Sequence, residues 1–313
     1  MSPNYFLKNG IFNTIYSSSP LRSIHQSKKI RYLDNVSEEL IFESSAGIKL
    51  QYFSSPSAQK AVIFLPGFLG NKNSKYLVGH AYNAMQLGAQ IVRIHPVDHG
   101  ESEHLNYDFF KATDISAILE LIQEILNNSP RTSFNLVGFS LGGNIALRVS
   151  QFTLHSNLEK VIAISPVLNP QQAMKAMDTN SKLINQYFLR KWKKSIANKQ
   201  KYFPDLALEK CLKLKSLLAI TEFFRARNGE FASLEDLFDD YAICGTDLSS
   251  PMRKTIILSS KDDPCIPIDP LLKINANELL DITVTENGGH CGFLENFAFK
   301  SSLEDWMIGK LYE

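Results

Sequence analysis

Short runs of β-branched and aromatic residues alternate along this chain with segments of helical periodicity, and this alternation is the strongest constraint on its fold. The strand-like runs cover residues 60–65, 90–94, 133–137, 160–164, 254–258 and 281–285, and a hairpin is predicted at 39–42 and 48–53. The helical patterns cover about 74–87, 113–128, 141–155, 266–279 and 294–312. This order predicts an α/β fold, with a mostly parallel sheet flanked by helices.

The alternation stops between residues 165 and 246, where helical patterns replace the strand-like runs. Segments 181–194 and 206–224 have the apolar spacing of helices that pack against another part of the protein. We therefore predict a helical cap or lid at 170–245, inserted into a core that consists of residues 1–169 and 246–313.

Charge and composition are those of an ordinary globular chain. Its 313 residues include 33 Lys and Arg and 32 Asp and Glu, for a net charge of +1. Such a balance gives no broad field to attract nucleic acid or an anionic membrane. Basic residues do gather within 181–201, which is typical of the solvated face of an amphipathic helix. We expect no nucleic-acid partner, and the oligomeric state stays open.

The cysteines and the N-terminus favour a reducing compartment. Cys211, Cys244, Cys265 and Cys291 are far apart and form no C-x-x-C pair, which indicates free thiols. Residues 1–20 contain no apolar stretch of signal-peptide length, and no run of apolar residues is long enough to span a membrane. We expect a soluble, cytoplasmic protein without a membrane anchor.

A G-x-S-x-G pattern lies between a predicted strand and a predicted helix. Ser140 is its serine, between Gly138 and Gly142, and the strand-like run 133–137 precedes it. Small residues on both sides allow a tight turn that exposes the hydroxyl, and the helix N-terminus favours negative charge there. This context predicts Ser140 as a nucleophile.

A serine nucleophile needs a histidine base and a carboxylate that orients the base. The chain offers both after its last two strand-like runs, with Asp262 and Asp263 after 254–258 and His290 after 281–285. Ser, Asp, His is the chain order of an α/β-hydrolase triad. We predict Asp263 rather than Asp262 as the acid, because Asp263 precedes Pro267 at the commoner spacing.

Backbone amides that could stabilise an oxyanion follow another strand. The sequence from Leu65 to Gly70 places glycines at 67 and 70, where they permit a turn. We predict that the N–H groups of Phe68 and Leu141 form the oxyanion hole.

A competing cluster follows the run 90–94. His95, Asp98 and His99 are residue types that bind metal ions, and Glu101, Glu103 and His104 follow closely. A metallohydrolase built on this cluster is one alternative function. We nevertheless expect no metal and no cofactor, because Asp98 to Ser102 also fits a simple turn of an α/β-hydrolase.

These residues resemble the α/β-hydrolase fold superfamily and, more narrowly, its YheT-like branch. The stretches that carry the narrower likeness are 9–15, 65–70, 138–144, 262–264 and 288–293. The resemblance implies Ser140 as nucleophile, Asp263 as its charge partner and His290 as base, and it implies ester hydrolysis or acyl transfer. The chain departs from the branch at 97–100, where relatives commonly carry an Arg-Gly-Cys type of turn.

The sequence therefore predicts a serine esterase that cleaves small-molecule carboxylic esters through an acyl-enzyme, with short to medium acyl chains. An acyltransferase that passes the acyl group to an alcohol would use the same residues. A binding protein on a hydrolase scaffold is the alternative from outside the enzymes.

Overall fold

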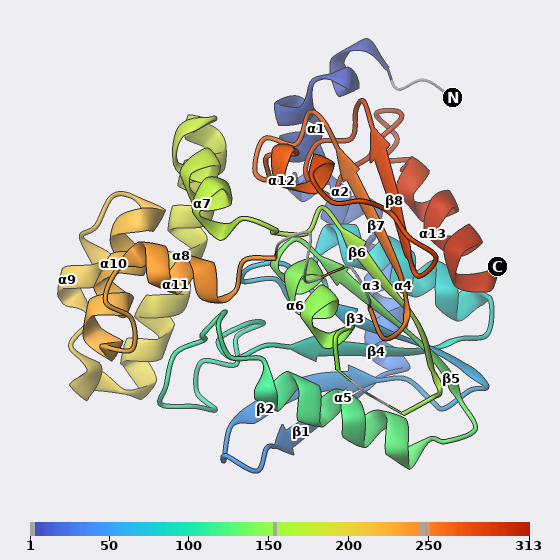
Figure 1. The fold of residues 1–313 in the computed structure, drawn as a ribbon, viewed down its shortest axis with the longest axis horizontal. Coiled ribbons are helices and arrows are strands. Elements are labelled where there is room, and N and C mark those ends of the chain that lie inside the picture. Colours follow the sequence, from blue (N-terminus) through green and yellow to red (C-terminus); the bar gives the residue numbers. More distant parts are fainter. Residues whose placement is uncertain (1–3, 153–154, 244–247, 249–250) are drawn as a thin grey trace.

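The computed structural model describes residues 4–152, 155–243, 248 and 251–313, and it contains an eight-stranded sheet in the order β1-β2-β4-β3-β5-β6-β7-β8 (Figure 1). The strands are β1 (Glu38–Glu43), β2 (Lys49–Ser54), β3 (Lys60–Leu65), β4 (Gln90–His95), β5 (Ser133–Phe139), β6 (Leu158–Ile164), β7 (Lys254–Ser260) and β8 (Leu280–Thr285). Only β1 with β2 and β2 with β4 pair antiparallel, and the other pairs are parallel. The predicted α/β fold with a mostly parallel sheet is confirmed.

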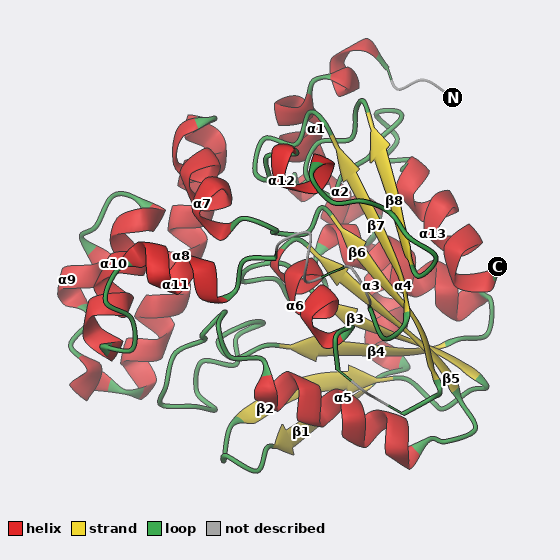
Figure 2. Cartoon of the chain, viewed as in Figure 1, coloured by secondary structure: helices red, strands yellow, loops and turns green. Residues whose placement is uncertain are grey.

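Helices cover both faces of the sheet (Figure 2). One face carries α3 (Ser27–Asn35), α4 (Lys75–Gln86) and α13 (Ser302–Tyr312), and the other carries α5 (Ser116–Asn128) and α6 (Leu141–Val149). Successive side chains of a strand point to opposite faces, so Ile63 of β3 packs with α5 while Phe64 packs with α4. Burial on both faces explains why the central strands read as continuous apolar runs.

The segment between β6 and β7 is helical and stands to one side of the sheet, at the left of Figure 1. It contains α7 (Pro170–Thr179), α8 (Lys182–Tyr202), α9 (Glu209–Leu212), α10 (Leu217–Asn228) and α11 (Leu234–Asp240), with a short 3-10 turn at Pro204–Leu206. Ile196, Leu208 and Ile220 belong to a separate apolar cluster within these helices. The predicted C-terminal boundary of the cap, at 245, lies outside the described residues, as does Cys244.

The N-terminal helices were not anticipated from periodicity. A 3-10 turn at Tyr5–Lys8 leads into α1 (Gly10–Ser17) and α2 (Pro20–His25), and α1 lies near the ends of β7 and β8 in Figure 1. Asn13 ties α1 to the C-terminal part of the chain, because its side-chain amide donates to the Leu294 carbonyl at 3.2 Å.

Several predicted helices are wrong in extent, and one of them, predicted at 141–155, ends at Val149 as α6. In place of 266–279 the structure has only α12 (Asp269–Leu272), because prolines at 267 and 270 lack amide hydrogens and the Asn277 side chain accepts from the Leu279 N–H instead. In place of 294–312 only α13 forms, because residues 294–301 close a loop through a bridge between Leu294 and Ser301. The predicted helix 206–224 is likewise divided between α9 and α10.

The longest helix, α8, has 21 residues and carries many of the basic side chains near its middle. Among the described residues, no helix is both long and apolar enough to cross a bilayer.

A buried ion pair joins α8 to the loop after β4. Lys199 is 1% exposed, and its Nζ donates to Asp98 Oδ1 at 2.6 Å and to the Asp108 carbonyl at 2.6 Å. The other carboxylate oxygen of Asp98 accepts from the Phe110 N–H at 2.9 Å. Each charge is therefore paired and hydrogen-bonded, as a buried charge must be.

Removing one member of this pair should destabilise the fold. Lys199→Met leaves the Asp98 carboxylate buried without its counter-charge, and we expect the free energy of unfolding in urea to fall by ~3–5 kcal/mol. Adding Asp98→Asn to that variant should recover part of the loss. Lys194→Met is the matched control on the same helix, because the Lys194–Glu101 pair is 70% and 77% exposed and should contribute under ~1 kcal/mol. Equal losses for the two lysine variants would contradict the argument.

Candidate active site

The turn between β5 and α6 holds Ser140 in a conformation that few non-glycine residues adopt, with φ of 55° and ψ of −117°. A side chain at Gly138 would place its Cβ 2.1 Å from the Gly142 carbonyl oxygen. One at Gly142 would meet the carbonyl oxygens of Leu65 and Pro66, each at 2.4 Å. The G-x-S-x-G pattern is thus required by close backbone approach on both sides of the serine.

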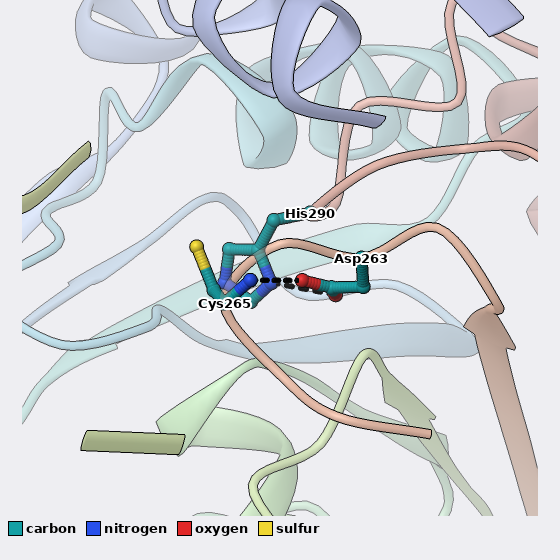
Figure 3. Close-up of side chains that lie close together, drawn as sticks. All are labelled: Asp263, Cys265 and His290. Carbon is teal, nitrogen blue, oxygen red and sulfur yellow. Dashed lines mark hydrogen bonds and ion pairs between the residues drawn. The ribbon is translucent and has the colours of Figure 1, made fainter. Parts of the chain in front are cut away.

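Ser140, His290 and Asp263 form a continuous hydrogen-bonded chain. His290 Nε2 lies 3.0 Å from Ser140 Oγ, and His290 Nδ1 lies 2.8 Å from Asp263 Oδ2. Figure 3 shows His290 facing Asp263, with Cys265 beside them. The imidazole is 12% exposed and the carboxylate 1%, so solvent reaches the histidine but hardly reaches the aspartate. The structure brings together all three residues that the sequence singled out.

The two adjacent aspartates have different partners. Asp263 Oδ1 accepts from the Cys265 and Ile266 N–H groups at 2.8 and 2.9 Å, which leaves Oδ2 for the histidine. Asp262 Oδ1 instead accepts from the Gly289 N–H at 2.9 Å. The Asp263 side chain thus contacts the His290 imidazole, whereas the Asp262 side chain contacts the backbone of the loop that carries His290.

The charge of Asp263 controls the protonation of His290. Burial is the largest single effect and lowers the pKa of His290, but its neighbours together, the Asp263 carboxylate first among them, raise this pKa to well above 6.5. Burial raises the pKa of the adjacent Cys265 thiol to about 12, so this sulfur stays protonated at neutral pH. Asp263 Oδ2 therefore lies where a carboxylate would interact directly with the imidazole Nδ1.

The predicted oxyanion donors lie next to the serine. Leu141 is the first residue of α6, and its N–H has no acceptor among the described residues; the same holds for the Phe68 N–H. The Gly67 N–H, by contrast, donates to the Tyr76 hydroxyl at 2.8 Å. A Cβ at Gly67 would lie 3.0 Å from the Ser140 Cβ, so the loop after β3 passes directly beside the serine.

A cavity of about 160 Å³ opens from Ser140 and Leu141 toward α7, α8 and α10. Its walls are mainly aromatic and aliphatic: Phe68, Phe109, Phe110, Val167, Met174, Met177, Phe188, Trp192, Ile196, Phe224, Leu237 and Tyr241. The rings of Phe68 and Trp192 meet edge to face with centroids 5.0 Å apart. The loop after β3 and helix α8 therefore contribute to the same wall of the cavity. The cavity suits an apolar group that reaches the serine.

His95, Asp98 and His99, the alternative metal cluster, each interact with different partners. His95 uses both ring nitrogens, for the Lys72 N–H at 2.6 Å and the Gln51 side chain at 2.9 Å, and burial lowers the pKa of His95 to about 3. His99 Nδ1 lies 2.8 Å from the Val97 carbonyl, and Asp98 pairs with Lys199. This arrangement disfavours a shared metal ion at these residues.

Within the described residues, one group of side chains has metal-ligand atoms within 4.8 Å of one another, namely Asp263, Cys265 and His290. Both nitrogens of His290 already face Asp263 and Ser140, and the Cys265 thiol is protonated. The donor set therefore fits a proton-transfer chain better than a metal site.

Sequence reasoning missed Thr14 altogether, and it named Asp262 only as the alternative acid without its contact to the histidine loop. The Thr14 hydroxyl accepts from the His290 N–H at 2.8 Å, and the Asp262 side chain holds the neighbouring Gly289 N–H. The stretch 9–15 was noted for its family likeness, but no local pattern could show that it contacts a loop 276 residues away.

A mostly parallel sheet that presents a serine, an aspartate and a histidine beyond its strand ends defines the α/β-hydrolase class. The chain belongs to the alpha/beta hydrolase fold family, whose model matches residues 60–297.

The curated relatives include the phospholipases ABHD3 of Mus musculus and Bos taurus, which are 22% and 21% identical over 253 and 251 residues. The alignments cover 78% of this chain and 61% of each relative. Among solved structures, the Pyrococcus furiosus esterase Pf2001 has a TM-score of 0.59 at 13% identity, covering 90% of this chain and 93% of that one. The Exiguobacterium antarcticum esterase EaEST has a TM-score of 0.53 at 16% identity, covering 88% and 100%. These structural likenesses show the fold alone.

The close approach at Gly142 is open to a direct test. Gly142→Ala forces a Cβ against two backbone oxygens that cannot move alone, and we expect a loss of ~1–3 kcal/mol or more in the free energy of unfolding. Gly309→Ala is the control within α13, because its Cβ would meet nothing nearer than Glu313 Oε1 at 3.7 Å. It should be neutral or stabilise by up to ~1 kcal/mol. A Gly142→Ala protein with the urea midpoint of the parent would show that the turn has more room than described.

Proposed function

We propose that this protein is a serine hydrolase that cleaves carboxylic esters through an acyl-enzyme. The observation that carries the proposal is the chain from Ser140 Oγ through His290 to Asp263, with bonds of 3.0 and 2.8 Å. Each group has the partner that its role needs, and the serine opens on an apolar cavity.

In the proposed reaction, Ser140 Oγ attacks the ester carbonyl carbon while His290 Nε2 takes the hydroxyl proton. The Phe68 and Leu141 amides hold the oxyanion, and Asp263 stabilises the imidazolium. Collapse of the intermediate breaks the bond to the alkoxy group, which leaves as the alcohol with the proton from His290. Water, deprotonated by His290, then attacks the acyl-enzyme, and the acid is released as Ser140 recovers its proton.

The cavity supports short to medium acyl chains. A cavity of about 150 Å³ lined by apolar side chains holds a benzene molecule, so the 160 Å³ here has room for an apolar group of about six carbons. The helices α7, α8 and α10 supply much of this wall, which supports the proposed role of 170–245 as a cap over the site. The phospholipase name of the curated relatives is compatible with an ester of a lipid acyl chain.

Two finer assignments belong to the same proposal. Membership of the YheT-like branch is supported by the motif around His290 and by the weak likeness to the ABHD3 phospholipases. A cytoplasmic location is supported by the free thiols of Cys211, Cys265 and Cys291.

Labelling with a fluorophosphonate probe tests the nucleophile without knowledge of the substrate. We expect one covalent adduct per chain by intact mass, and none in Ser140→Ala, because His290 Nε2 lies 3.0 Å from Ser140 Oγ and can act as its base. Ser195→Ala is the matched control, since Ser195 lines the same cavity but donates to the Asp98 carbonyl at 3.4 Å. An adduct that survives in Ser140→Ala, or no adduct on the folded parent protein, would refute the proposal.

The pH dependence of labelling tests the acid. His290 acts as base only when neutral, and Asp263 raises its pKa, so the rate should rise with pH through a midpoint above 6.5. Asp263→Asn removes the charge that raises the pKa and leaves the burial that lowers it. The midpoint should therefore move to lower pH, while the plateau rate falls by about 10³–10⁴-fold because the imidazole loses its orientation. Asp262→Asn, which alters the neighbouring carboxylate only, should keep the midpoint; a reversed result would assign the role to Asp262.

A further inference from the structure

The loop that carries His290 has few local interactions that would hold its conformation. It follows β8 without regular structure, and Gly289 and Cys291, on either side of the histidine, both have φ of 58°. A left-handed conformation is disfavoured for a cysteine. The position of the imidazole must therefore be maintained by contacts from outside the loop.

One of these contacts comes from α1. The Thr14 hydroxyl accepts from the backbone N–H of His290 at 2.8 Å and donates to the Gly10 carbonyl at 2.7 Å. Its donor and acceptor capacities are both engaged, so the hydroxyl is fixed in orientation. Thr14 is 7% exposed, which keeps water from replacing it freely.

The same edge of α1 also touches the loop that carries the acid. A Cβ at Gly10 would lie 1.7 Å from the Asp262 carbonyl oxygen, so the two backbones are in direct contact. A Cβ at Gly289 would lie 2.6 Å from the Gly10 carbonyl oxygen and 2.7 Å from Thr14 Oγ1. Helix α1 thus packs against the loops of the acid and of the base at once.

Helix α1 is itself anchored. The Asn13 amide donates to the Leu7 carbonyl at 2.9 Å, and its side-chain oxygen accepts from the Leu294 N–H at 3.3 Å. On the opposite side, Ile11 and Ile15 pack with Val167 and Cys265. These contacts hold α1 in place independently of the His290 loop, so α1 can fix the position of that loop.

We infer that α1 is part of the working active site and that Thr14 is a positioning residue, which fixes the His290 backbone so that the imidazole faces Ser140. This inference rests on the proposed function. The segment lies outside residues 60–297, the part of the chain that the family model matches. Thr14 does not line the cavity, so it acts through His290 and has no contact with the substrate.

Replacement of the hydroxyl by a methyl group tests the inference. Thr14→Val keeps the shape of the side chain but leaves the His290 N–H without its acceptor. A misplacement of about 1 Å costs on the order of 10²-fold in rate, so we expect the fluorophosphonate labelling rate to fall by about 10–100-fold. The labelled fraction should stay near one adduct per chain. Thr14→Ser, which retains the hydroxyl, should label within about threefold of the parent rate.

The design separates positioning from folding. An unfolded fraction lowers the final amount of adduct, whereas misplacement of His290 lowers the rate constant of the folded fraction. Thr14→Ala, which also lacks the hydroxyl but adds no methyl group, is labelled in parallel in case Thr14→Val folds poorly. Thr179→Val is the matched control, because Thr179 is exposed at the C-terminal end of α7, where it donates to the Lys175 carbonyl at 2.9 Å, and its loss should leave the rate unchanged.

Hydrogen exchange at the His290 amide gives a readout independent of activity. We expect protection of this amide in the parent and in Thr14→Ser, and loss of protection in Thr14→Val. Parent-like labelling rates in Thr14→Val, a lower labelled fraction at an unchanged rate, or unchanged protection would each overturn the inference and leave the proposed function standing. Absence of any adduct on the parent protein would overturn both.

Discussion

The backbone between β5 and α6 passes so close to the end of β3 that no side chain fits between them. Gly142 satisfies this constraint, while Gly138 satisfies a second one, because its Cβ would lie 2.1 Å from the Gly142 carbonyl oxygen. The other features of the site depend on these two approaches. The loop after β3 passes beside Ser140 at Gly67, and both Phe68 and Ser140 line the cavity. A methyl group at Gly142 would push the turn that carries Ser140 away from the end of β3.

Hydrogen bonds to buried charged groups are the second requirement of this fold. Asp263 is buried, yet both of its oxygens have donors, two of them backbone N–H groups. The carboxylate can therefore stay charged at low exposure and raise the pKa of His290. Asp98 and Lys199 solve the same problem farther from the serine, where a paired charge ties α8 to the loop after β4.

The sequence predicted what short-range physics determines. Strand β3 has the predicted bounds of 60–65, because a buried parallel strand needs a continuous apolar run. Ser140, Asp263 and His290 were predicted because each follows such a strand, and parallel strands end at one edge of the sheet. The helix expected at 266–279 failed because proline and asparagine chemistry overrides apolar spacing. Thr14 could not be assigned, because a hydroxyl that supports a distant backbone amide leaves no periodic signal.

The contact between Thr14 and His290 spans 276 residues of sequence. Contacts of such separation close late in folding, because the entropy of closing the intervening chain must be overcome first. During synthesis, α1 leaves the ribosome long before the histidine loop exists. We expect the nascent chain to build most of its sheet with the N-terminal helix still undocked. The active site would then be completed in one of the last steps of folding. In a refolding experiment, activity would therefore recover later than secondary structure.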